Sequence, residues 1–489
     1  MTAKKISEII QNISKNGNLR QKVANGTIWL TLGGGFEQGL RLVRNMILTR
    51  LIAPESMGSM AIILAVNVAL ESFTQVGIKE AVIQNDKGLD KKLLNSAWWV
   101  LFIRSLLLSI AGIVSAPAIA TFFKTDDLTF LFRLSFLSVI LNGTISTGTY
   151  AALKRMEYRR WVCYYYGGGF TGVTTTILLS LYYPGIHALV IGYIAESLFR
   201  TVYSYILFSF KPTFQIASES IKPLLNFAKG MFGLPLFFFI FSRTDIFVLG
   251  KMCTTDEVGL YSMAASIAQI PSTFIIMIIE PVILPLLAKF KDQKNKLSDI
   301  VLKILKVIIL SAFPLLSVCF IYKADILEVL FGKEYSVMGN TFMVLLFVSL
   351  LKVLNIPLAS VYFAIGRPDY QRFSTILRAM ILLVIIVPFI IFFGVIGASI
   401  AVLTALVIAF IFQLVHFNRL LKVNFLPIIF VVLKSVLLSL PIIMLSIIPI
   451  NNTFLYNIFS VSVVLLTVLY QARLCFNTIF KIEKSGLVK

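Results

Sequence analysis

The sequence is poor in charged residues and in the residue types that build most catalytic and metal sites. Only 14% of its 489 residues are charged, and it has four cysteines and two histidines. The cysteines lack metal or redox spacing, and His187 and His416 are too far apart for a zinc motif. No GxxxxGK[ST] phosphate-binding loop occurs anywhere in the chain. The sequence therefore predicts no cofactor, no metal, no enzymatic activity and no ATP-driven step.

The polar segments of the chain show no signal peptide, no acidic site and no domain outside the cytoplasm. The N-terminal tail is polar and lacks the apolar core of a signal peptide. The Asp126-Asp127 pair has no acidic or histidine neighbours, so we interpret it as a solvated turn. The longest loop predicted to lie outside the cytoplasm, KADILEVLFGKEYSV, is too short to form a domain.

Long hydrophobic runs are what the chain has in abundance. Hydrophobic residues make up 58% of it, and its mean hydropathy is +0.89. Runs long enough to cross a hydrocarbon core of ~30 Å recur throughout, and helices satisfy their own backbone hydrogen bonds there. We therefore predict an all-α polytopic membrane protein with about fourteen transmembrane helices. The predicted spans are residues 27–50, 57–78, 97–118, 128–150, 162–182, 186–209, 229–250, 259–286, 300–322, 338–363, 373–393, 394–415, 426–447 and 453–472.

The net charge of +21 is distributed in a way that indicates a membrane orientation rather than nucleic-acid binding. Most of the 44 lysines and arginines fall in the two tails and in every second loop. The opposite loops hold only Arg50, Lys124, Lys251, Lys323 and Lys333. This asymmetry follows the positive-inside rule and predicts a membrane protein with both termini in the cytoplasm.

Two motifs occur twice and divide the chain into related halves. RLIAPESMG at residues 50–58 corresponds to KMCTTDEVG at 251–259, and YAALKRMEYRRW at 150–161 corresponds to YFAIGRPDYQRF at 362–373. We therefore expect an N-terminal half and a related C-terminal half, followed by two helices without partners in the repeat. The N-terminal half is predicted to span residues 1–209, the linker 210–228 and the C-terminal half 229–415. The two extra helices and the tail span 416–489.

Charged residues inside the apolar runs are the strongest candidates for function. Glu37, Arg41 and Arg44 fall on one face of the first predicted helix, at spacings of four and three. Glycines 33–35 precede them and permit either close helix packing or a bend. Charges at the bilayer centre cost about 2.5 to 3.5 kcal/mol each, so this face must meet a partner or a water-filled cavity.

Further charges lie along the other predicted helices. Glu196 and Arg200 are four residues apart and are expected to pair, whereas Arg104 and Arg133 lie near helix ends, where they can reach the headgroups. The remaining intramembrane candidates are Glu71, Arg243, Asp245 and Glu280, and Pro281 after Glu280 implies a kink.

The repeat places Arg44 and Asp245 at equivalent positions. Opposite charges there are suited either to a static ion pair or to a shared ligand site, and the sequence leaves both interpretations open.

The two copies of the first motif, together with the run PSTFIIMIIEPVILPLLAKFKD at 271–292, resemble the polysaccharide transporter family. These are the Wzx-type flippases of the MOP exporter superfamily. The resemblance implies two six-helix lobes around a central cavity and two extra C-terminal helices. It also implies that an oligosaccharide linked to undecaprenyl diphosphate crosses the membrane by alternating access.

Under this resemblance the candidate site residues take specific roles. Arg41, Arg44 and Arg243 would bind the diphosphate or acidic sugars, because guanidinium groups hold such oxygens bidentately. Glu37, Glu71, Asp245 and Glu280 would serve in gating or ion coupling. The implied partners are the lipid-linked oligosaccharide, membrane lipids, and a polysaccharide polymerase with its chain-length regulator, but not nucleic acid.

Three alternatives remain. A multidrug extruder of the same superfamily would carry cations, which an arginine-rich cavity repels. A lipid II flippase differs only in its substrate. A membrane polysaccharide polymerase would be expected to place catalytic residues in a sizeable outer loop, which this chain lacks.

Overall fold

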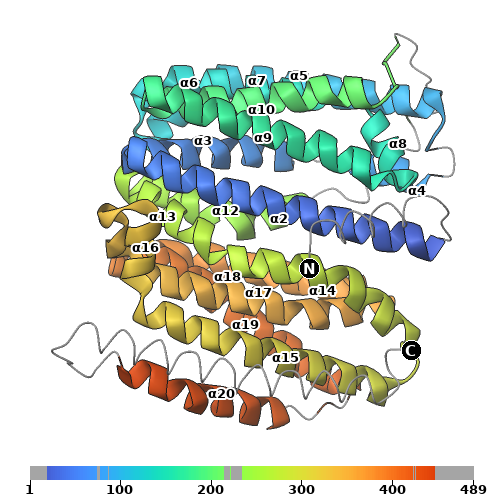
Figure 1. Cartoon of the computed structure of the whole chain (residues 1–489), viewed down its shortest axis with the longest axis vertical. Helices are drawn as coiled ribbons and strands as arrows, with labels where there is room; N and C mark the ends of the chain where they lie inside the picture. The colour runs from blue at the N-terminus through green and yellow to red at the C-terminus, as the bar shows by residue number, and fades with distance from the viewer. Residues whose placement is uncertain are drawn as a thin grey trace, which may run out of the picture. The chain divides into compact units, whose positions relative to one another are not determined.

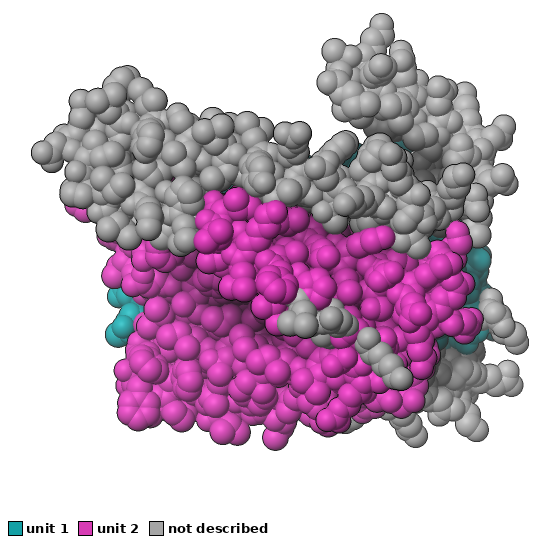
Figure 2. Space-filling model, turned by 90° about the horizontal axis from the view of Figure 1, so that it is seen from below, with its two compact units in different colours: residues 1–259 teal, residues 260–489 magenta. Residues whose placement is uncertain are grey.

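The computed structural model describes residues 19–73, 77–85, 88–213, 234–421 and 426–445, together with Ile221 and Val423. All regular elements within these ranges are helical (Figure 1). The chain divides into two compact units, residues 1–259 and 260–489, which are coloured separately in Figure 2. The boundaries predicted at 209 and 228 remain predictions, and most of the linker lies outside the described residues.

Helices long and apolar enough to cross a membrane confirm a polytopic membrane protein. Among the described residues there are six, or seven if one bent pair counts as a single span. The count of about fourteen helices remains a prediction, and the last predicted helix, 453–472, lies outside the described residues. The six spans are Lys91–Phe123, Thr255–Met277, Lys294–Ile321, Lys333–Ala364, Pro368–Phe393 and Val395–Leu421.

The first unit contains the helices that carry most of the predicted site. They are α2 (Leu19–Leu51), α3 (Pro54–Phe73), α4 (Ile78–Gln84), α5 (Lys91–Phe123), η1 (Asp126–Leu128), α6 (Thr129–Ser135), α7 (Leu137–Gly143), α8 (Gly148–Lys154), α9 (Tyr158–Tyr182), α10 (Ile186–Leu207) and α12 (Leu234–Met252). Helix α9 packs along both α2 and α10, and α12 packs on α3 (Figure 1).

The span predicted at residues 128–150 is broken instead of continuous. The segment Asp126–Gly143 and helix α8 meet at a bend of 54°. Polar groups from other helices bind the backbone at the break: Tyr205 donates to the Thr144 carbonyl at 2.6 Å, and the Ser204 hydroxyl accepts from the Ser146 amide at 2.9 Å. Thr147 in turn donates to the Leu94 carbonyl. Such partners allow a helix to break within an apolar environment.

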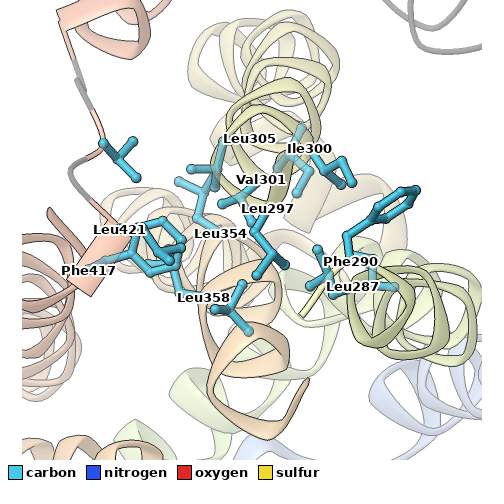
Figure 3. Close-up of a cluster of buried hydrophobic side chains, with 14 of the residues drawn as sticks. Leu287, Phe290, Leu297, Ile300, Val301, Leu305, Leu354, Leu358, Phe417 and Leu421 are labelled. Atoms are coloured by element: carbon cyan, nitrogen blue, oxygen red, sulfur yellow. The ribbon is translucent and has the colours of Figure 1, made fainter. Parts of the chain in front are cut away.

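The second unit is built around a core of aliphatic side chains. Its helices are α14 (Ile270–Lys289), α15 (Lys294–Ile321), α16 (Lys323–Phe331), η2 (Lys333–Met338), α17 (Gly339–Ala364), α18 (Pro368–Phe393), α19 (Val395–Leu421) and α20 (Leu426–Leu445). Leu287, Leu297, Val301, Leu358 and Phe417 are fully buried where α14, α15, α17 and α19 meet (Figure 3).

The span predicted at residues 259–286 contains α13 (Thr255–Ala268) and α14, which are interrupted only at Gln269, and Thr255–Met277 across that residue is one of the six spans. Helix α13 begins in the first unit and ends in the second, and α14 starts after Gln269 with a proline in its first turn. Proline is well tolerated at that position because it removes no intrahelical hydrogen bond. Helix α14 continues past Glu280 to Lys289, and the kink predicted at Pro281 remains a prediction.

Both repeated motifs form local structures of the same kind in their two copies. Each copy of the first motif starts a helix: Pro54 opens α3, and Thr254 and Glu257 form a capping box at the start of α13, with the Thr254 amide donating to Glu257 Oε2 at 2.9 Å. In the second motif an arginine pairs with the acid two residues later. The distances are 3.9 Å for Arg155–Glu157 and 3.0 Å for Arg367–Asp369.

Candidate functional site

The three charged residues predicted on one face of α2 form the first part of the site. Arg41 Nη2 lies 2.7 Å from Glu37 Oε1, and Arg41 Nε donates to the same oxygen at 3.1 Å. Arg44 donates from Nε and Nη2 to Asn45 Oδ1 at 3.2 and 3.1 Å. The Arg41 side chain is nevertheless 49% exposed. The ion pair therefore leaves about half of the Arg41 side chain uncovered.

Helix α10 supplies the second part of the site, an ion pair that the sequence predicted. Arg200 Nη2 lies 2.6 Å from Glu196 Oε1, and both side chains are largely buried. The Arg200 guanidinium also stacks over the Tyr165 ring of α9 at 4.1 Å. The Glu196 carboxylate acts electrostatically on both Arg41 and Arg44, so the pairs on α2 and α10 form one charge cluster.

Glycines in α9 and α2 allow these helices to come close enough to form the cluster. A Cβ at Gly168 would lie 2.3 Å from Arg200 Cγ, and one at Gly172 would lie 2.4 Å from Glu196 Cβ. In α2, a Cβ at Gly33 would lie 2.3 Å from the Tyr166 ring. The expectation that the glycines at 33–35 serve close packing is thus confirmed at Gly33.

A second polar cluster lies elsewhere in the same unit. Arg104 Nη2 on α5 donates to the Glu71 backbone carbonyl of α3 at 2.7 Å. The Glu71 carboxylate forms a side-chain hydrogen bond with Asn142 of α7 and interacts electrostatically with Arg104 and with Tyr193 of α10. Arg104 therefore binds a neighbouring helix, whereas the sequence suggested that it reaches the headgroups. Asn142 was not predicted, because an isolated asparagine in an apolar run carries no pattern.

The remaining candidate residues lie on two other helices. Arg243 is exposed on α12, where Asp245 Oδ1 accepts from the Ile246 amide at 2.9 Å. The charges that act on Arg44 are those of Arg41, Glu37 and Glu196, so its pairing with Asp245 remains a prediction. Glu280 is exposed on α14, in the second unit.

The chemistry of the α2–α10 cluster favours an anionic ligand. It combines three guanidinium groups (Arg41, Arg44 and Arg200) with two carboxylates (Glu37 and Glu196), which leaves an excess of positive charge. Guanidinium groups bind phosphate oxygens through paired hydrogen bonds, and a low local dielectric strengthens that attraction. Within the described ranges, no group of three or more histidine, cysteine or acidic side chains is arranged to hold a metal.

Comparison with known proteins gives a consistent family. The family model described as "Polysaccharide biosynthesis protein" matches residues 47–340. The lipopolysaccharide biosynthesis protein WzxC of Escherichia coli (strain K12) is 24% identical over 72% of this chain and 72% of its own length. The succinoglycan biosynthesis transport protein ExoT of Rhizobium meliloti (strain 1021) is 23% identical over 63% of this chain and 62% of its own length.

A solved structure shows the same fold. The lipid II flippase MurJ, in an inward closed conformation, superposes with a TM-score of 0.74. The match covers 93% of this chain and 100% of that one, at 14% sequence identity. The TM-score shows a shared fold, and a shared fold does not imply a shared function.

Proposed function

The chain belongs to the polysaccharide biosynthesis protein family, and on that premise we propose that it is a flippase for a lipid-linked oligosaccharide. The proposal rests on the charge cluster of Arg41, Arg44, Glu37, Glu196 and Arg200 on α2 and α10, two helices that the sequence predicts to cross the membrane. A net positive cluster within the membrane would suit the diphosphate that joins the lipid to the sugar. The family and the MurJ-like fold support membrane transport of such a molecule.

In this proposal the cargo is an oligosaccharide repeat unit on undecaprenyl diphosphate, used for O-antigen, capsule or exopolysaccharide. Arg41, Arg44 and Arg243 bind its anionic groups, whereas Glu37, Glu71, Asp245 and Glu280 act in gating or ion coupling. The protein lies in the cytoplasmic membrane, with both termini in the cytoplasm. It alternates between two conformations, and the cargo shifts their equilibrium only through its differential affinity for the two.

The exposed guanidinium of Arg41 argues against the multidrug antiporter as an alternative. A cationic drug approaching the cluster would meet like charges, and repulsion of that kind is strong where the dielectric is low. A lipid II flippase would use the same charge chemistry, so tests with defined substrates must separate it from an oligosaccharide flippase.

Replacing single residues of the Glu37–Arg41 pair tests the proposal. If Arg41 binds cargo, Arg41→Ala will reduce polysaccharide export sharply at near-normal membrane abundance. Glu37→Gln, which breaks the same ion pair but retains the guanidinium, will reduce export less. Arg133→Ala removes an exposed arginine from α6 and provides the matched control. A parallel fall of abundance and export in both pair variants would instead assign the pair to folding.

A further inference from the structure

A groove runs along the last two turns of α2, beside the face that carries Arg44. Val43, Met46, Ile47, Arg50 and Leu51 line it from α2, and Leu181 lines it from α9. Positions 43, 46, 47 and 50 recur at the spacing of one helical stripe. Val43 is 51% exposed and Leu181 is 58% exposed, whereas Met46, Ile47 and Leu51 are half-buried. The groove spans about 10 Å of helix, at 1.5 Å per residue.

The groove has an apolar body and a cationic end. All its lining residues are apolar except Arg50, which is exposed in the last turn of α2. Beside this end, Tyr182 and Tyr183 close α9 and are 78% and 75% exposed. Exposed tyrosines at a helix end are typical of the membrane interface. On the predicted topology, the apolar stripe extends from that interface into the hydrocarbon layer, with Arg50 at headgroup level.

From this arrangement we propose that the groove binds the lipid carrier itself, a long-chain prenyl diphosphate, on the side where α2 ends. The prenyl chain lies along Val43, Met46 and Ile47, and the diphosphate pairs with Arg50. A stripe one helix wide accommodates one chain, whereas a phospholipid must place two. The charge pattern of the loops assigns this end of α2 to the outer leaflet. The inference rests on the proposed function and deepens it by giving the carrier a site after translocation.

The spacing of arginines along α2 fits a carrier that leaves the charge cluster and then binds in the groove. Arg44 lies in the charge cluster and Arg50 lies six residues further toward the helix end, a rise of about 9 Å. A diphosphate released from Arg44 thus finds the next guanidinium on the same helix.

Photo-crosslinking tests the site directly. Undecaprenyl diphosphate with a diazirine in its prenyl chain is added to the protein in nanodiscs. The sample is then irradiated, and the labelled residues are mapped by mass spectrometry. We expect labels on Val43, Met46, Ile47 and Leu181. Unlabelled undecaprenyl diphosphate should suppress them, but an equal concentration of phosphatidylglycerol should not. Arg50→Gln should reduce labelling about tenfold, as expected when a charge-assisted contact to phosphate is lost.

Two matched controls distinguish the groove from a general lipid contact. Lys124→Gln removes another exposed cation of the same unit, and Val114→Phe adds bulk at an exposed position of α5. Both should leave labelling unchanged, whereas Val43→Phe should reduce it. Suppression by phosphatidylglycerol, or unchanged labelling in Arg50→Gln, overturns the carrier site but leaves the proposed function intact. If no residue of the wild-type protein is crosslinked, both the carrier site and the proposed function are contradicted.

Discussion

Gly58 and Gly259, the equivalent glycines of the two copies of the first motif, pack backbone to backbone. A Cβ built on Gly58 would lie 2.7 Å from the Gly259 nitrogen and 1.8 Å from the Thr255 carbonyl oxygen. A Cβ on Gly259 would lie 3.0 Å from the Gly58 nitrogen and 2.0 Å from the Pro54 carbonyl oxygen. The repeated glycine is therefore the point at which the first turns of α3 and α13 touch, and neither position has room for a side chain.

Alanine at either glycine should destabilise the protein. The atoms that a methyl group would meet are backbone atoms, which cannot rotate away, so we expect a loss of about 1 to 3 kcal/mol or more. Thermal unfolding in detergent and membrane abundance measure the effect. Gly39→Ala is the control, because a Cβ there has no neighbour within 4 Å. Wild-type stability in Gly58→Ala and Gly259→Ala would contradict the close contact.

Charge reversals at Arg44 and Asp245 test whether these equivalent positions of the repeat act together. If the two side chains pair in one conformation of the transport cycle, removing one charge leaves the other uncompensated, at a cost of about 3 to 5 kcal/mol. Arg44→Asp and Asp245→Arg should each reduce export, and the double swap should recover part of the loss at matched expression. A double variant no better than the worse single variant would remove the pairing, and Arg44 would remain a candidate ligand of the cargo.

The pKa of Cys253 predicts slow alkylation of that thiol. Burial and the nearby Glu257 carboxylate disfavour the thiolate and raise the pKa of Cys253 to about 11. Because the thiolate is the reactive form, iodoacetamide should react about a hundredfold more slowly at neutral pH than with a thiol of pKa 9. The rate should rise about tenfold for each pH unit between 7 and 10. A variant with Cys253 as its sole cysteine permits the measurement, and a plateau near pH 9 would contradict the raised pKa.

The predicted topology places Thr255 and Asp369 on opposite sides of the membrane. Thr255 begins α13, and Asp369 lies in the first turn of α18 with a side chain that is 57% exposed. Cysteines at the two positions, introduced singly in a background without native cysteines, should react with a membrane-impermeant maleimide from opposite sides. Labelling of both from one side would contradict the predicted orientation and the count of fourteen helices.

The sequence predicted those parts of the site that depend on local helical spacing. Glu196 and Arg200 are one turn apart, so their ion pair follows from the helix alone. The common face of Glu37, Arg41 and Arg44 follows in the same way. That the chain is a membrane protein was equally predictable, because apolar length alone determines whether a helix can cross a bilayer.

Contacts between distant segments could not be predicted in this way. Arg104 reaches the Glu71 carbonyl, and Tyr205 caps the break at Thr144, through packing that leaves no pattern in either segment. The repeat identified Gly58 and Gly259 as equivalent, but equivalence did not indicate that they touch. Single polar residues within apolar runs become informative only when their neighbours in space are known.

Translocation by the purified protein tests the central claim most directly. The protein is reconstituted into liposomes with an undecaprenyl-diphosphate-linked oligosaccharide that carries a fluorophore on its sugar, and impermeant dithionite quenches the outer-leaflet pool. We expect wild-type protein to expose inner-leaflet cargo faster than empty liposomes do. The variant with both Arg41→Ala and Arg44→Ala, folded and reconstituted to the same level, should be at least about tenfold slower, because it lacks the guanidinium groups that bind the diphosphate. The flippase function would be contradicted if liposomes with wild-type protein exposed cargo no faster than empty ones. A double variant as fast as wild type would contradict the role of the two arginines.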